Sequence, residues 1–252
     1  MVVEGLNFKF SRMSGHSKWA KIHRQKAVAD AKKGGVFTKL ANVIIIATKA
    51  GGGNPDMNFR LKLAIDKAKA SNMPKENIER AIKRGTGDLG DKKIEQVLYE
   101  GFGPGGIAFV VECLTDNKNR TSSNIKHLFS ESGGSIGSPN SVLWQFENKG
   151  MIGIKKSISF AEAMEIELID LGVQDIQHDD NGCTLSCETS RLEHIKKFLE
   201  EKNIPIEFAD MEHVPKNKVR VNDPSMINKL EKFISEIENN EDVNNYYTNA
   251  EY

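Results

Sequence analysis

The chain changes character at Tyr99-Glu-Gly-Phe-Gly-Pro-Gly-Gly-Ile-Ala-Phe-Val-Val-Glu-Cys-Leu114, where a glycine-rich segment runs directly into an apolar one. A run of glycines can indicate a nucleotide-binding loop, but such a loop must follow a strand and open a helix. Here Ile107–Leu114 is apolar and rich in strand-forming residues, so it predicts a strand. The glycines are therefore expected to form the turn between two strands, Gln96–Glu100 and Ile107–Leu114.

Upstream of this segment, apolar residues recur at helical spacing. Three such patterns run from Val36 to Ala47, from Phe59 to Ala68, and from Pro74 to the terminating Gly85. Gly51-Gly52-Gly53 separates the first two patterns and lacks the Gly-Lys-Ser/Thr sequence of a phosphate-binding loop, so it is expected to be an interhelical turn. The patterns predict a small helical domain over residues 20–88, preceded by an extension and basic arm over residues 1–19.

Downstream, short strand patterns alternate with helical patterns in a β-β-α-β rhythm that occurs about twice. This rhythm predicts an α+β fold with two ferredoxin-like domains after the helical one. Val142–Glu147 and Met151–Lys155 are expected to be separate strands, and a helix is expected to begin at Ser190 with a capping box to Glu193. The Asn- and Glu-rich tail from about residue 239 is expected to be disordered.

Charge is distributed unevenly along the chain, although the total is zero. Residues 1–90 contain 18 Lys and Arg against 7 Asp and Glu, whereas residues 91–252 contain 17 against 28. The net charges of these two parts are therefore +11 and −11. Lysine and arginine at this density neutralise phosphates and release counterions, so the N-terminal third is expected to bind nucleic acid.

The candidate contacts in this third fall into two groups. The arm offers basic residues around an aromatic one: His16, Lys18, Trp19, Lys21, Arg24, Lys26, Lys32 and Lys33. The helical patterns offer six further cations that are expected to line one face: Arg60, Lys67, Lys69, Arg80, Lys83 and Arg84. Trp19 could stack on an unpaired base or anchor the arm to the body, and both interpretations stay open. A solvated face is the alternative for the helical cations, although a neutral face would alternate its charges.

One further candidate lies in the acidic part. Asn117-Lys-Asn-Arg-Thr121 opens a predicted helix, and a helix N-terminus with Asn119 and Arg120 could bind an anion. The competing interpretation is ordinary N-capping by Asn117 or Asn119.

Several classes of protein are not supported by the sequence. The three cysteines, Cys113, Cys183 and Cys187, have no second pair at metal-binding spacing, and no nucleophile constellation is visible. We therefore expect no metal, no cofactor and no enzymatic activity. The sparse cysteines and the lack of a membrane-length apolar run fit a cytoplasmic chain without membrane contact. Met13 is an alternative start, and a monomer is favoured.

Several motifs then resemble one family in order and spacing. They are Gly15-His-Ser-Lys-Trp19, Lys49-Ala-Gly-Gly-Gly-Asn-Pro55, Asn72-Met-Pro74, Ile78-Glu-Arg-Ala-Ile-Lys-Arg-Gly85, Tyr99-Glu-Gly-Phe-Gly-Pro-Gly-Gly106, Leu114-Thr-Asp-Asn-Lys-Asn-Arg-Thr121 and Val142-Leu-Trp-Gln-Phe146. Together they are similar to the YebC/PmpR family from about Met13 to the last predicted helix. One departure is Asn140, where the family usually has glycine.

The resemblance implies three domains, with the third inserted in the second. The second would comprise residues 89–148 and 215–252, and the inserted third residues 149–214. It also implies a non-enzymatic regulator of gene expression that binds DNA. The alternative that the resemblance implies is a ribosome-associated translation factor that binds ribosomal RNA. The family includes a mitochondrial branch that activates translation and bacterial members that relieve stalling on proline-rich sequences. Phosphates are common to DNA and ribosomal RNA, so charge does not choose between them. A phosphate-ester hydrolase using Arg120 and a protein adaptor using the acidic domains are two further alternatives.

Overall fold

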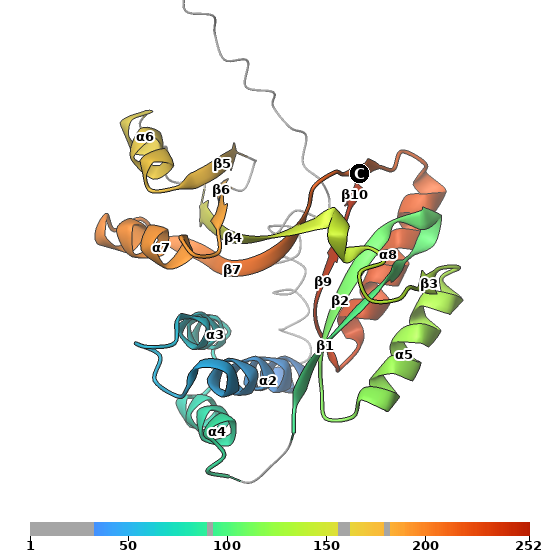
Figure 1. The fold of residues 1–252 in the computed structure, drawn as a ribbon, viewed down its shortest axis with the longest axis horizontal. Coiled ribbons are helices and arrows are strands. Elements are labelled where there is room, and N and C mark those ends of the chain that lie inside the picture. The colour runs from blue at the N-terminus through green and yellow to red at the C-terminus, as the bar shows by residue number, and fades with distance from the viewer. Residues whose placement is uncertain (1–32, 90–92, 156–161, 179–181) are drawn as a thin grey trace, which may run out of the picture. The chain divides into compact units, whose positions relative to one another are not determined.

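The computed structural model describes residues 33–89, 93–155, 162–178 and 182–252. These residues form two compact units. The larger unit contains residues 33–148 and 212–252, and the smaller unit contains residues 149–211. The fold is α+β, with a three-helix region followed by two antiparallel sheets and their helices (Figure 1).

The three predicted helices are confirmed as α2 (Lys33–Gly51), α3 (Phe59–Ala70) and α4 (Lys75–Thr86). Their apolar stripes meet in one core that includes the fully buried Ile44 and Leu61. The glycine run after α2 is an interhelical turn, as predicted. Asn58 closes it, since its side-chain amide donates to the carbonyls of Ala47 and Gly52, both at 2.8 Å, and its Oδ1 accepts from the first turn of α3. The predicted end at Gly85 is wrong, because α4 continues to Thr86 and Gly87 ends it at φ 92°.

The glycine-rich segment Gly101–Gly106 belongs to a hairpin, as predicted. Strands β1 (Glu95–Phe102) and β2 (Ala108–Thr115) pair in antiparallel register, with Phe102 opposite Ala108. The turn between them contains the short 3-10 helix η1 (Pro104–Gly106), with Gly105 and Gly106 at φ 71°. A side chain at Gly103 would meet the rings of Phe109 and Phe233, so only glycine fits there. These glycines therefore serve packing and turn geometry.

Strand β2 is buried on both faces and lies inside the first sheet, whose order is β3-β1-β2-β9, with β3 at Ser135–Ile136 and β9 at Val243–Thr248. On one face, its alternate residues from Phe109 to Cys113 pack against α5 (Lys118–Glu131) and α8 (Pro224–Asn239). Figure 1 shows both helices on the same side of this sheet. On the other face, Ala108 and Val110 pack in a small cluster with Val142, Phe146 and Tyr247. Leu114, further along the same strand, joins the core of the three helices.

The predicted disordered tail is wrong. Strand β9 (Val243–Thr248) pairs antiparallel with β2, and β10 (Ala250–Glu251) pairs in parallel with β8 (Val219–Arg220). The tail's asparagines concealed this order because their amides are satisfied inside the protein. Asn249 accepts from the backbone N–H of Ala108 at 3.0 Å, and Asn245 donates to the Tyr247 hydroxyl at 2.9 Å. Composition alone does not reveal such pairing.

The smaller unit is built on the second sheet, whose order is β5-β6-β4-β7. Its elements are β4 (Phe146–Lys155), α6 (Glu162–Asp170), β5 (Val173–His178), β6 (Gly182–Glu188), α7 (Leu192–Glu201) and β7 (Ile206–Pro215). The predicted hairpin is confirmed as the antiparallel pair β5–β6. The predicted capping box is wrong, because Arg191 is the N-cap of α7 without a side-chain cap, and the Ser190 hydroxyl contacts Glu188 instead.

The predicted strand Val142–Glu147 is also wrong in its first half. Residues Leu143–Gln145 form the 3-10 helix η2, and a single strand, β4, then runs from Phe146 through the segment predicted as a separate strand. The cause is the buried side chain of Glu100, which is 6% exposed. Its carboxylate accepts three backbone hydrogen bonds, from Asn140 at 2.7 Å, Val142 at 2.9 Å and Leu143 at 2.8 Å. These bonds curl the segment around the carboxylate.

Asn140 lies in this curled segment with φ 66°. That left-handed conformation favours glycine, and asparagine tolerates it better than other side chains do. The departure from the family's usual glycine therefore keeps the same backbone shape.

We expect Glu100→Gln to destabilise the larger unit, because the amide places N–H groups against backbone donors that the carboxylate now satisfies. The expected loss is about 1–3 kcal/mol in the free energy of unfolding, measured by urea titration. The matched control is Glu201→Gln at an exposed position of α7, which should change stability by less than about 0.5 kcal/mol. Equal stability of the two variants would show that Glu100 does not hold the segment.

At Asn140, we expect glycine to be tolerated and valine to be costly. Asn140→Gly should stay within about 1 kcal/mol of the natural chain, whereas Asn140→Val should lose about 1–3 kcal/mol, because a β-branched residue is strained at this φ. Denaturant midpoints of the two variants measure the difference. A valine variant as stable as the glycine variant would contradict the proposed backbone requirement.

Candidate nucleic-acid interface

The structure describes only part of the predicted interface. Seven arm positions lie outside the described residues: His16, Lys18, Trp19, Lys21, Arg24, Lys26 and Lys32. Lys33 is the first residue of α2, and its side chain also lies outside the described part. The geometry of the arm therefore stays a prediction, and the described interface begins with the three helices.

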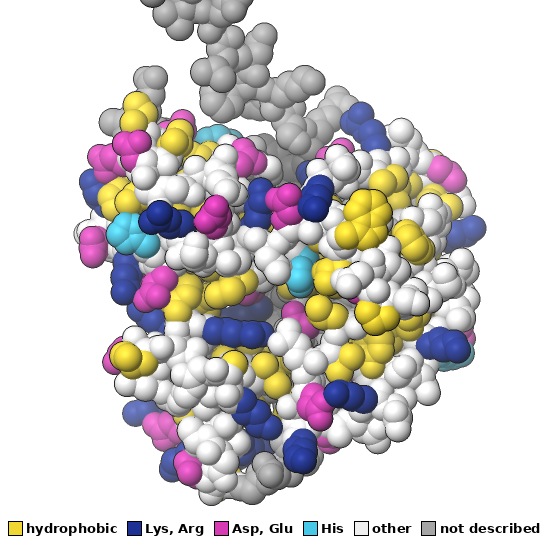
Figure 2. Space-filling view, viewed as in Figure 1, with side chains coloured by type: hydrophobic (Ala, Val, Ile, Leu, Met, Phe, Trp, Pro, Cys, Tyr) yellow, Lys and Arg dark blue, Asp and Glu magenta, His cyan; other side chains and the backbone are white. Residues whose placement is uncertain are grey.

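All six predicted cations of α3 and α4 are exposed: Arg60, Lys67, Lys69, Arg80, Lys83 and Arg84. Figure 2 shows dark blue Lys and Arg side chains, with some magenta Asp and Glu among them, over the part of the molecule where Figure 1 draws these helices. Residues three and four apart lie on one helix face, so Arg80, Lys83 and Arg84 share a face of α4. On α3, Lys67 and Lys69 diverge by about 200° around the axis, and the Arg60 guanidinium donates to Gln96 at 3.0 Å.

Helix electrostatics explain some of these positions. The last turns carry Lys49 in α2, Lys67 and Lys69 in α3, and Lys83 and Arg84 in α4. Cations at a helix C-terminus interact favourably with the helix dipole, which is a structural reason for their placement. The dipole explains why these cations lie in the last turns of the helices. It does not neutralise their charge, so they can still attract a polyanion.

The packing of α2 against α4 brings two of these helix ends together. Gly85 lies so close to Thr48 that a side chain at Gly85 would overlap it, and a side chain at Gly53 would meet Thr86. Lys49 follows Thr48 and Arg84 precedes Gly85, so the backbones of Lys49 and Arg84 lie close together. We call Lys49, Lys83 and Arg84 the helix-end cluster. Lys49 was missing from the predicted contacts, although it opens the motif around the glycine turn.

Positive charge continues from the helix-end cluster toward the start of α5. The Lys118 ammonium pairs with the exposed Glu95 carboxylate and, with further attraction from Lys93 and Lys49, lowers the pKa of Glu95. Three lysines thus surround one carboxylate at the beginning of β1. This excess of positive charge extends from the helical region to Asn117–Thr121, the segment that the sequence offers as a candidate anion site.

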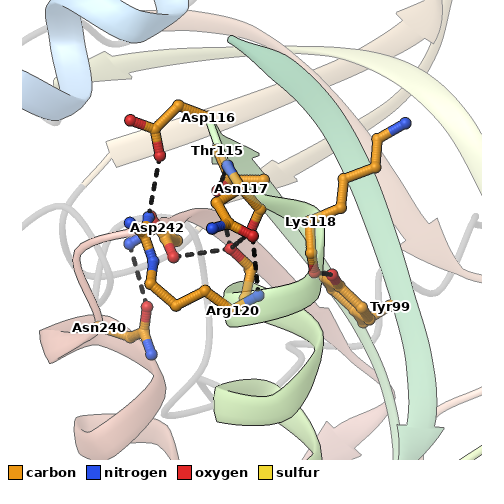
Figure 3. A network of polar contacts seen from close by, with 9 residues as sticks. Tyr99, Thr115, Asp116, Asn117, Lys118, Arg120, Asn240 and Asp242 are labelled. Carbon is orange, nitrogen blue, oxygen red and sulfur yellow. Dashed lines mark hydrogen bonds and ion pairs between the residues drawn. The ribbon is translucent and has the colours of Figure 1, made fainter. Parts of the chain in front are cut away.

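Arg120 itself pairs with carboxylates of the same chain (Figure 3). Its guanidinium donates to Asp116 at 3.2 Å and to Asp242 at 2.9 Å, and the pair with Asp242 raises its pKa. Asn117 is the N-cap of α5, because its Oδ1 accepts from the Arg120 backbone N–H at 3.1 Å. The N-capping interpretation is therefore confirmed for Asn117, and Asn119 is left exposed. Arg120 joins α5 to the residues before β9, and two carboxylates compensate its charge.

Lys39, in α2, is a second cation with a structural partner. Its ammonium donates to the Glu238 carbonyl at 2.9 Å, in the last turn of α8. Burial lowers the pKa of Lys39, and the nearby acidic groups oppose that shift only in part. Lys39 therefore attaches the helical region to the first sheet's covering helix, in the favourable orientation at a helix C-terminus.

The described residues lack the features of two other kinds of site. No group of three or more His, Cys, Asp or Glu side chains there could hold a metal ion. No helix within the described ranges has the length and apolar character to cross a membrane. The three cysteines are buried, and burial raises the pKa of Cys113 to about 12 and that of Cys187 to about 11, so neither is an activated nucleophile.

Comparison with known proteins identifies the family. Residues 17–88 match the model of the TACO1/YebC protein N-terminal domain, and residues 94–250 match that of the TACO1/YebC second and third domain. A probable transcriptional regulatory protein of Caldanaerobacter subterraneus is 45% identical over 240 residues, covering 95% of this chain and 98% of the relative. One from Chlorobaculum parvum is 48% identical over 241 residues, covering 95% of each.

A solved structure agrees with the fold. The conserved hypothetical protein Aq1575 from Aquifex aeolicus superposes with a TM-score of 0.81 at 39% identity, covering 88% of this chain and 92% of that one. Family models match most of the chain, and curated relatives align along nearly its whole length. The chain therefore belongs to the TACO1/YebC family, a non-enzymatic family whose curated relatives here are probable transcriptional regulatory proteins.

Proposed function

We propose that this protein is a cytoplasmic regulator of gene expression that binds nucleic acid through its basic N-terminal third. The helix-end cluster carries the proposal, because packing of α2 on α4 gathers Lys49, Lys83 and Arg84 from distant parts of the sequence. The exposed cations of α3 and α4 extend this surface, and the arm from His16 to Lys33 adds further positive charge.

The proposed contact is with phosphates, not base edges. Direct base recognition in the major groove uses a helix that presents side chains such as Asn, Gln or Arg to the bases. Helix α3 contains no Asn or Gln, and its Arg60 is bonded to Gln96. Phosphate contacts position a protein on nucleic acid without reading its sequence. Duplex DNA is the favoured target because the relatives are named transcriptional regulators.

Ribosomal RNA presents the same phosphates and is the second target to test. An extended basic arm with an aromatic residue suits structured or single-stranded RNA as well as it suits DNA. In this proposal the acidic remainder forms two ferredoxin-like domains, with residues 149–214 inserted in the domain of residues 89–148 and 215–252. Their negative charge keeps most of their surface away from phosphates and leaves it for shape or protein contacts.

We expect the double substitution Lys83→Gln and Arg84→Gln to weaken nucleic-acid binding. Each phosphate contact releases counterions, so losing two should reduce the slope of log affinity against log salt by about 1.8 for duplex DNA. Fluorescence anisotropy of a labelled duplex across a salt series measures both quantities. The same pair of changes at Lys21 and Arg24 tests the arm in the same assay.

The matched control is Lys229→Gln with Lys232→Gln, which removes two exposed charges from α8, outside the helical region. This control should leave affinity and salt slope unchanged. Unchanged affinity and slope in the Lys83 and Arg84 variant, or an equal loss in the control, would refute the proposed interface.

Two parallel measurements separate the targets. Retention on duplex DNA is compared with co-sedimentation with ribosomes, using the same protein at physiological salt. Loss of DNA retention but not of co-sedimentation in the Lys83 and Arg84 variant supports DNA. The reverse pattern supports the ribosome.

A further inference from the structure

Trp144 is the most exposed aromatic side chain among the apolar residues that the structure describes, with 65% of its surface accessible. Tryptophan is highly buried on average, so an exposed one needs a reason beyond packing. Its apolar neighbours do not share this exposure. Val142 is fully buried, Phe146 is 6% exposed, and Leu143 packs partly against the same small core.

The segment that carries Trp144 is held in place. The indole N–H donates to the Ser141 carbonyl at 3.1 Å, which restrains the ring. The flanking backbone is fixed by the Glu100 carboxylate through its bonds to Asn140, Val142 and Leu143. A restrained ring with an open face loses little conformational entropy when a planar ligand stacks on it.

A basic segment lies against the backbone that carries Trp144. The Lys216 backbone N–H donates to the Gln145 carbonyl at 2.8 Å, directly after Trp144. Residues 214–222 contain Lys216, Lys218 and Arg220 and no acidic residue, although the surrounding part of the chain is strongly acidic. Lys218 pairs with Glu251 at 3.3 Å.

Two of these cations keep their charge available. Within the described ranges, no carboxylate lies within ion-pair distance of the exposed Lys216 or Arg220. Asp223, three residues after Arg220, is the N-cap of α8 and accepts from the Ser225 backbone N–H at 3.0 Å. Glu212, four residues before Lys216, also interacts with a partner within the protein.

We propose that Trp144, Lys216 and Arg220 form a second nucleic-acid contact, specific for single strands. An unpaired base stacks on the indole, and the two cations bind the phosphates beside it. An aromatic platform next to unpaired cations is the arrangement that binds single strands without reading sequence. A protein-binding site would instead need a contiguous apolar patch, and here Val142 and Phe146, the apolar residues two positions before and after Trp144, are buried. This inference rests on the proposed function and adds a surface outside the basic third.

Tryptophan fluorescence tests the inference directly. The chain has two tryptophans, so Trp19→Phe leaves Trp144 as the only one. A labelled oligouridine is added until its anisotropy reports saturation, which makes the result independent of any affinity change at position 19. Stacking predicts quenched Trp144 emission in the complex, whereas an unstacked ring keeps its emission.

Affinity provides the second readout. Trp144→Ala should weaken oligouridine binding on the order of tenfold and change duplex DNA binding by less than about twofold. Trp144→Tyr should retain most of the affinity, because its ring still stacks. Ile169→Ala, which truncates an exposed apolar side chain on α6, is the matched control and should behave as the natural chain does. Circular dichroism checks that each variant is folded.

The outcomes separate this inference from the proposed function. If the natural chain binds neither duplex nor oligouridine, the proposed function fails. If binding persists and depends on Lys83 and Arg84, but Trp144 emission and the Trp144→Ala affinity are unchanged, only the inference fails. Emission that responds to ribosomal proteins but not to oligouridine overturns the inference in favour of a protein partner.

Discussion

Burial of β2 on both faces is the constraint on which the larger unit depends. One face of the strand packs under α5 and α8, and the other meets the Val142 cluster and, through Leu114, the core of the three helices. A one-residue shift in register would turn the alternate residues from Phe109 to Cys113 away from α5 and α8 and point Glu112 into that core. The helical region, the curled segment around Glu100 and the C-terminal strand are therefore positioned by the same eight residues.

The packing around β2 determines which cations are available to bind a polyanion. Lys39 and Arg120 attach elements to the sheet, through the Glu238 carbonyl and Asp242 respectively, so their charges serve the fold. The cations at the ends of α2 and α4 are placed for a different physical reason. They satisfy helix dipoles, and packing then gathers them at one end of the helical region. A positive surface results from the same contacts that build the core.

Local patterns in the sequence predicted the elements whose neighbours are near in the chain. The three helices, the β1–β2 hairpin and the N-cap of α5 all follow from residues within a few positions of one another. Two local predictions are displaced by one or two residues, the N-cap of α7 and the end of α4. The larger failures involve distant partners. Glu100 bends a segment some forty residues later, and Asp242 pairs with Arg120 from 122 residues away. The asparagines of the tail predict disorder because their amides look solvated in the sequence, although these amides bond within the protein. Lys49 became a candidate only when packing placed it beside Arg84.

Native-state hydrogen exchange of the β2 amides tests the central role of this strand most directly. If β2 is the common frame, its amides from Phe109 to Cys113 should be the most protected in the larger unit. They should exchange with the free energy of global unfolding, as measured by denaturant titration. Exchange of β2 through a local opening, while α5 and α8 remain protected, would contradict the account.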